Sequence, residues 1–127
     1  MNEAASYMAR STPDCAIKRT QMDDRELLTL AARAAKITIS WDGWATAPMV
    51  LTDDGADTRT WNPLADDAEA LRLAVALRLW LHVDKYGASA RRPGDAWLGC
   101  EAHKYGGIEA ATRRAIVRVA AAIGKEQ

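Results

Sequence analysis

The chain has 127 residues, 49% of them hydrophobic, which fits one domain with a single core. Its 17 basic and 17 acidic residues cancel, so it lacks the large basic surplus that is typical of strong nucleic-acid-binding proteins. Two cysteines are too few for a disulfide framework, and no apolar run reaches the length of a bilayer span.

Residues 1–22 show no hydrophobic periodicity and contain a Ser-Thr-Pro turn signal, so we expect a poorly ordered N-terminal extension. They also lack the apolar segment of a signal peptide, which with the low cysteine content predicts a cytoplasmic protein. The domain is expected to cover residues 23–127, and Met22 is an alternative translation start to Met1.

The first half of the domain predicts a helix followed by a hairpin. Asp23 and Glu26 form a capping-box pattern before apolar residues at helical spacing, which predicts a helix over residues 24–36. Residues 37–41 and 47–51 read as two strands, joined through an Asp-Gly turn signal. Because Pro48 cannot donate a ladder hydrogen bond, the second strand is expected at a sheet edge.

Residues 61–79 carry the clearest helix signal, and we expect the fold to be organised around this helix. Pro63 suits a helix start, and Asp66 with Glu69 forms a second capping-box pattern. The side chains expected to face the core share helical spacing: Leu64, Ala68, Leu71 and Val75, with Ala74 and Leu77 on the flank.

The second half predicts two more strands and a last helix. Alternating side chains predict strands over residues 80–86 and 97–103. Residues 87–94 between them read as a loop, although the first half of this segment could prolong the earlier strand. Apolar spacing over residues 108–123 predicts the last helix, which Gly124 ends. The expected order is α-β-β-α-β-β-α, an α+β fold with three helices and a four-stranded, largely antiparallel sheet.

Three segments together resemble one family, the phage ABA sandwich domain proteins. They are DDRELLTLAARAA at residues 23–35, WNPLADDAEALRLAV at 61–75 and AATRRAIV at 110–117. These are small proteins of tailed bacteriophages and prophages, so the resemblance implies a location in the cytoplasm of a bacterial host cell. It covers residues 23 to about 124 and implies an α/β/α sandwich, whereas strand alternation alone favours helices on one face. No activity and no site residue comes with the resemblance.

The sequence contains no catalytic, cofactor or metal motif. His82, Glu101 and His103 fall on one predicted strand face, but a metal site needs three or four converging ligands. Cys100 lies in the apolar phase of its strand, as a small buried residue does. The acids of residues 53–57 lack the spacing of a calcium loop. We therefore expect no cofactor, no metal and no enzymatic activity.

Five tryptophans and no phenylalanine are an unusual balance for a domain of this size. Tryptophan supplies large contact area at low entropic cost, so exposed tryptophans mark interfaces. If the strands at residues 80–86 and 97–103 are adjacent, their second faces form one aromatic and polar patch, partly covered by a helix. The candidates for binding a partner on this patch are Trp80, His82, Trp97 and His103.

Two functional hypotheses come before all others. The leading one is a phage or prophage accessory protein that binds a host or phage protein, for example a host defence factor. The alternative is a nucleic-acid-associated protein of phage replication or recombination. Its phosphate contacts would come from Arg91, Arg92, Arg113, Arg114 and Arg118. A small-molecule binder or enzyme ranks last. The charge is acidic over residues 42–70 and basic from residue 91 onward, which also permits a homo-oligomer.

Overall fold

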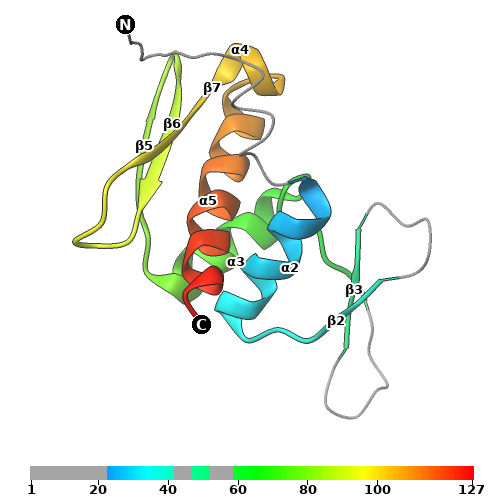
Figure 1. The fold of residues 1–127 in the computed structure, drawn as a ribbon. Coiled ribbons are helices and arrows are strands. Elements are labelled where there is room, and N and C mark those ends of the chain that lie inside the picture. The colour runs from blue at the N-terminus through cyan, green and yellow to red at the C-terminus, as the bar shows by residue number, and fades with distance from the viewer. Residues whose placement is uncertain (1–22, 42–46, 52–58) are drawn as a thin grey trace, which may run out of the picture.

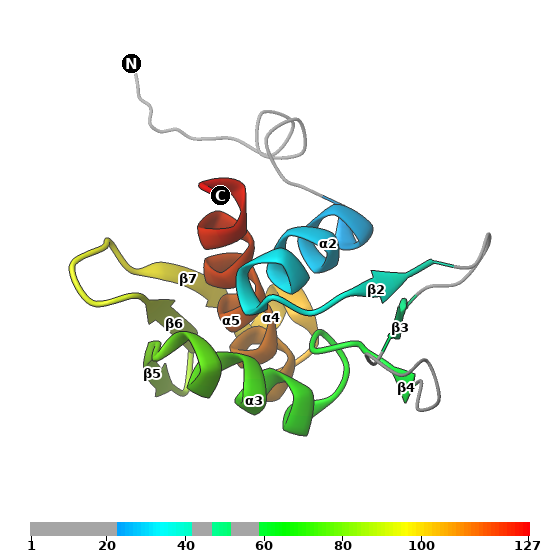
Figure 2. The ribbon, with the colours of Figure 1, turned by 90° about the horizontal axis from the view of Figure 1, so that it is seen from below.

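A computed structural model describes residues 23–41, 47–51 and 59–127. The expected extension at residues 1–22, the Asp-Gly turn at residues 42–43 and the acidic loop at residues 53–57 lie outside the described residues. The described chain has a mixed α+β fold with two three-stranded antiparallel sheets. The helices gather in the middle of the molecule and the two sheets lie on opposite sides of them (Figures 1 and 2).

The first helix, α2 (Asp24–Ala35), confirms the predicted start. The Asp23 carboxylate accepts a hydrogen bond of 2.8 Å from the Glu26 amide, which satisfies one of the free donors of the first turn. Lys36 ends the helix in the left-handed conformation. Leu27, Leu28 and Ala31 are buried on the side that packs against the other helices.

The small sheet joins β2 (Ile39–Ser40), β3 (Met49–Val50) and β4 (Arg59–Thr60). The order is β2-β3-β4, so β3 is the central strand and the edge position expected from Pro48 is wrong. Pro48 lies one residue before the ladder and takes part through its carbonyl, which accepts from the Trp61 amide at 2.8 Å. The missing N–H of a proline therefore removes no ladder bond here. β4 was not predicted.

Helix α3 (Asp67–Leu77) has the predicted N-cap but buries a different face. The Asp66 carboxylate accepts from the amides of Ala68 and Glu69. Leu71 and Val75, expected in the core, are 60% and 67% exposed. The buried residues of α3 are Glu69, Ala70, Leu73 and Ala74. Apolar residues occur almost all round this helix, so helical spacing is compatible with burial of either of two faces. The face with more alanine is buried because its small side chains allow a closer approach to a neighbouring helix.

Glu69 completes an ion-pair cluster instead of the second half of the capping box. Its carboxylate is only 4% exposed and lies 3.0 Å from Arg59 Nε and 3.0 Å from Arg72 Nη1. The Asp66 amide, its expected partner, donates to the Asn62 carbonyl. Burial alone would raise the pKa of Glu69, but hydrogen bonds and charge from the two guanidiniums hold that pKa below its ordinary value. The cluster fastens β4 to α3.

The element around which the chain is organised is the last helix, α5 (Ile108–Lys125), and not the helix expected at residues 61–79. Its buried residues belong to two core clusters on opposite sides of the helix. Val117, Ala120 and Ala121 pack towards α2 and α3, whereas Ala115 and Val119 pack towards the larger sheet. α5 lies between α2 and that sheet in Figure 2.

Gly124 lies inside α5 and does not end it, contrary to the prediction. It is buried, and a Cβ at this position would overlap the Leu30 carbonyl oxygen of α2. The glycine is therefore required by the close approach of two helices, because only a residue without a side chain fits there.

The larger sheet joins β5 (Trp80–Asp84), β6 (Gly87–Arg91) and β7 (Leu98–Glu101) in that order. The loop expected over residues 87–94 is thus a strand in its first part, and it turns back along β5 instead of prolonging it. The Asp84 carboxylate makes this turn by accepting from the amides of Tyr86 and Gly87, at 2.8 and 3.1 Å. A short helix, α4 (Ala102–Tyr105), replaces the end of the strand expected over residues 97–103.

The inner face of the larger sheet packs on α5 through small residues. Ala88, Ala90 and Cys100 are buried there, as Cys100 was predicted to be. The predicted four-stranded sheet is wrong, because two additional strands divide the chain into two three-stranded sheets. Helices lie between these sheets, instead of on both faces of one sheet. No described helix covers the outer face of the larger sheet.

Candidate functional site

The outer face of the larger sheet carries Trp80 and Trp97 on either side of Arg91. In the ladder Trp80 is the cross-strand partner of Arg91. The Arg91 guanidinium lies 4.5 Å from the centroid of the Trp80 ring and 4.9 Å from that of Trp97. Both tryptophans are about half exposed. We name this group the Trp80–Arg91–Trp97 stack. Cation–π attraction of this kind contributes about 0.5–1 kcal/mol per contact at an exposed site and holds the three side chains in one arrangement.

One further contact limits the freedom of Arg91. Its Nη1 donates to the Asp95 carbonyl at 3.2 Å. Its Nε is buried and has no hydrogen-bond partner among the described residues. A guanidinium held between two rings and anchored by a backbone carbonyl is a rigid element, so both indoles are presented in a fixed orientation.

His82 and Asp84 continue the outer face along β5. His82 Nε2 lies 3.4 Å from Asp84 Oδ2, and both side chains are exposed. The backbone amide of Tyr86 contributes most to holding the pKa of Asp84 below its ordinary value, followed by the Gly87 amide and His82. Asp84 is therefore ionised at neutral pH, beside an imidazole.

The structure brings together three of the four predicted partner-binding residues. Trp80 and Trp97 meet through Arg91, and His82 shares the outer face of β5 with Trp80. β5 and β7 are not adjacent as expected, because β6 lies between them. His103 is exposed on α4 and not on the sheet, so its expected position is wrong. Nearby, a hydrogen bond from Lys104 lowers the pKa of Glu101.

Three of the five arginines proposed for nucleic acid hold α5 to its neighbours. Arg113 Nη1 lies 2.6 Å from Asp67 of α3, and Arg114 Nη2 lies 2.9 Å from Asp24 at the start of α2. Arg118 donates to a backbone carbonyl of β7 at 3.1 Å. These charges lie close to carboxylate or carbonyl oxygens, which reduces the positive potential that phosphates would meet.

The other two, Arg91 and Arg92, lie at the end of β6. Arg91 is part of the stack, and Arg92 pairs with Asp95 at 2.9 Å and with Glu126 at 3.2 Å. The hydrogen bond that Arg92 donates to Asp95 contributes most to raising the pKa of Arg92, and the hydrogen bond to Glu126 adds to it. The five arginines are thus divided among separate internal contacts and do not form one basic face.

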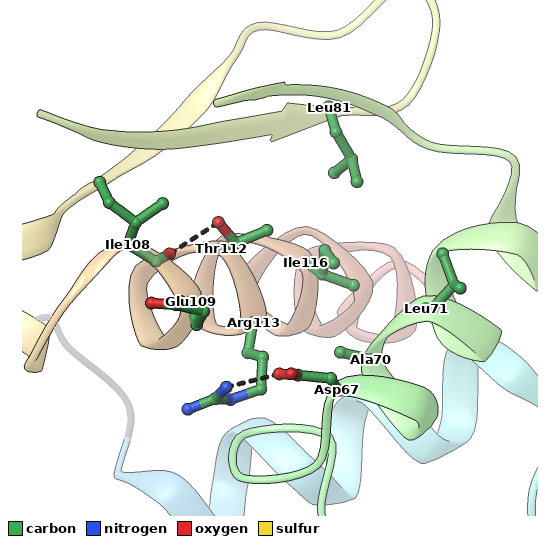
Figure 3. Close-up of a pocket in the computed structure, with 9 residues that line it drawn as sticks. All are labelled: Asp67, Ala70, Leu71, Leu81, Ile108, Glu109, Thr112, Arg113 and Ile116. Carbon is green, nitrogen blue, oxygen red and sulfur yellow. Dashed lines mark hydrogen bonds and ion pairs between the residues drawn. The ribbon is translucent and has the colours of Figure 1, made fainter. Parts of the chain in front are cut away.

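A groove that the sequence did not predict lies between α3, β5 and α5, with a volume of about 280 Å³. We name it the α3–β5 groove. Its lining is mainly apolar, and in Figure 3 Leu81 points from β5 towards the helices while Leu71 and Ile116 lie across from it. The ion pair of Asp67 and Arg113 lies at one side. Leu71 was expected in the core, which is why helical spacing could not reveal this groove.

The described residues contain no group of three or more His, Cys, Asp or Glu side chains that could hold a metal ion. Within the same part of the chain, no helix has the length and hydrophobicity needed to cross a membrane. The buried Cys100 thiol lies 3.5 Å from Arg118 Nη1.

No protein-family model matches this chain, and no curated protein or solved structure shows significant similarity to it.

Proposed function

We propose that this protein is a binding module that recognises another protein through the outer face of its larger sheet. The observation that carries this proposal is the Trp80–Arg91–Trp97 stack, in which two half-exposed indoles are held by one guanidinium. Tryptophan and arginine are enriched among the residues that dominate binding energy at interfaces. Side chains already held in place lose little entropy on binding, so the stack is prepared for a partner.

The rest of the face supports contact with a broad partner surface. Ser89 and Gly99 are small cross-strand neighbours in the middle of this face, and His82 lies opposite Ser89 on its other side. His82 and Asp84 supply polar groups along β5, between Trp80 and the turn that joins β5 to β6. This arrangement, an aromatic anchor with a polar rim, is that of protein–protein interfaces.

The resemblance of three segments to phage proteins supports a biological setting for this module. We infer a phage or prophage accessory protein in the cytoplasm of the host cell, which binds a host or phage protein. A factor of host defence fits this setting as a target. The internal contacts of the five arginines give the nucleic-acid alternative no geometric support.

Affinity purification tests this proposal when wild type and variants are compared as baits. The chain is expressed in lysogenic or infected bacteria, lysates are treated with nuclease, and captured proteins are quantified by mass spectrometry. We expect one partner to be lost with Trp80→Ala and with Trp97→Ala. Leu51→Ala is the matched control, because it removes an exposed apolar side chain next to β3, and β3 lies across the helices from the larger sheet.

Purified partner and variants then give dissociation constants. Each tryptophan substitution should raise Kd by at least about 30-fold, as an interface hot spot of about 2 kcal/mol requires. Leu51→Ala should leave Kd unchanged, and all thermal midpoints should stay close to that of wild type. Equal binding by all variants contradicts the proposal, as does binding that disappears on nuclease treatment.

A further inference from the structure

The free edge of β5 is a second surface that is open to contact. β5 pairs with β6 on one side, and no strand pairs with its other side among the described residues. Asp84 and Gly87 close a two-residue turn, so the backbone groups of Trp80, His82 and Asp84 point towards β6. The N–H and C=O groups of Leu81 and Val83 consequently point away from the sheet. Such an edge is a template for a further strand.

The inner face of β5 lacks the cover that the rest of the sheet has. Leu81 and Val83 are 40% and 48% exposed, whereas Ala88 and Ala90 on the same face of β6 are 5% and 0% exposed. β5 therefore extends past α5, and the α3–β5 groove lies under it (Figure 3). A strand added beside β5 would hold its inward side chains over this groove and cover exposed apolar surface.

We propose that a second copy of this chain supplies that strand. The two β5 strands would pair antiparallel about a two-fold axis and join two three-stranded sheets into one continuous sheet. This proposal is independent of the proposed function, because the outer face of the joined sheet remains accessible and carries two copies of the Trp80–Arg91–Trp97 stack.

The side chains of β5 are complementary to themselves in one register. With the axis at Val83, each His82 lies opposite Asp84 of the second copy, and the two valines face each other above the grooves. Leu81 and Trp80 then lie beside the turn residues Lys85 and Tyr86 of the second copy, so no like charges meet. Val83 also presents its N–H and C=O to the edge, so the central pair exchanges two hydrogen bonds.

The pairing of polar side chains also favours this register over the register with its two-fold axis at His82. An axis at His82 would place two imidazoles together and would set Trp80 against Asp84. The register at Val83 instead gives two imidazole–carboxylate pairs per dimer, and a second copy is the one partner guaranteed to carry both groups at this spacing. Self-complementarity of one surface patch is what a two-fold interface requires.

Two substitutions at His82 test the proposal, because its side chain is exposed and either replacement leaves the monomer's packing intact. His82→Lys places a cation opposite Asp84 of the second copy, whereas His82→Asp places two carboxylates together at two positions. Sedimentation equilibrium over a wide range of concentration measures the dimer dissociation constant. We expect a dimer for wild type and for His82→Lys, and a dissociation constant raised by about tenfold or more for His82→Asp.

Val83→Lys provides a second variant, which places two ammonium groups at the axis and should abolish the dimer. Trp97→Ala, which lies on the outer face away from the edge, should leave the dissociation constant unchanged. Circular dichroism checks that each variant is folded. A wild-type chain that stays monomeric at every concentration overturns the proposal. Equal dimer dissociation constants for His82→Lys and His82→Asp would overturn the proposed register. Loss of the dimer with Trp97→Ala would overturn the proposed interface and show that the two copies meet through the outer face.

Discussion

Helices α3 and α5 are both rich in alanine and larger aliphatic residues, yet the fold uses them differently. α5 contributes buried side chains to two core clusters on opposite sides. α3 buries one arc and exposes Leu71 and Val75 on another. The difference shows that apolar spacing identifies a helix, whereas its position among the other elements decides how much of its circumference is buried.

The largest expected effect is at the centre of α5. Ile116 is buried in the helical core and also forms part of the α3–β5 groove. Ile116→Ala should lower the free energy of unfolding by about 2–5 kcal/mol, because it leaves a cavity that its neighbours cannot fill. Urea unfolding followed by circular dichroism measures this. A variant as stable as wild type would contradict the central role of α5.

Close packing of α5 on α2 is tested by Gly124→Ala. The added methyl group meets the Leu30 carbonyl, so we expect a loss of about 3 kcal/mol, the upper range for overpacking, although alanine is the better helix former. Ala122→Gly is the matched control, since Ala122 is exposed two residues earlier and should lose only about 1 kcal/mol through helix propensity. Stabilisation by Gly124→Ala would show that the two helices can move apart freely.

Glu69 is the buried charged residue of α3, and its substitution has a pH signature. Because its pKa is lowered in the folded state, Glu69 adds stability above its unfolded pKa, and this contribution is lost as pH falls through the folded pKa. Glu69→Gln should cost about 1–2 kcal/mol at neutral pH, since the side chains of Arg59 and Arg72 are 52% and 67% exposed and can be hydrated.

The difference between the two proteins should shrink as pH is lowered from about 5 towards 3, because protonated Glu69 resembles glutamine. Urea unfolding at a series of pH values measures this. A difference that stays constant over that range would mean that Glu69 does not titrate with folding. Asp24→Asn is a control at an exposed ion pair and should change stability by less than about 1 kcal/mol.

The smallest expected effect concerns the exposed side of α3. Leu71→Ala should change the free energy of unfolding by less than about 0.5 kcal/mol when measured on monomer, because its side chain stays mainly in water. Leu73→Ala, two residues further on and buried, should cost about 2–5 kcal/mol. Equal costs would contradict the face of α3 that the structure assigns.

Local chemistry made part of this protein predictable from its sequence. The starts of α2 and α3 depend on Asp23 and Asp66, each of which bonds to amides within three residues, so a short segment contains both partners. The burial of Cys100 followed from alternation along one strand. The exposed tryptophans could be suspected for a similar reason, because Trp80 and Trp97 fall on the face opposite to the buried phase.

Tertiary structure decided the rest, because the deciding partners are distant in sequence. β6 is made of small residues with weak strand preference, and it becomes a strand only between β5 and β7. Its position brings Arg91 between two tryptophans that sequence alone could not connect. In the same way, sequence alone predicts a helix end at Gly124, whereas the structure shows that the glycine is needed for contact with the Leu30 carbonyl. Sequence alone also predicts that Leu71 is buried, whereas the buried face of α3 is a different one.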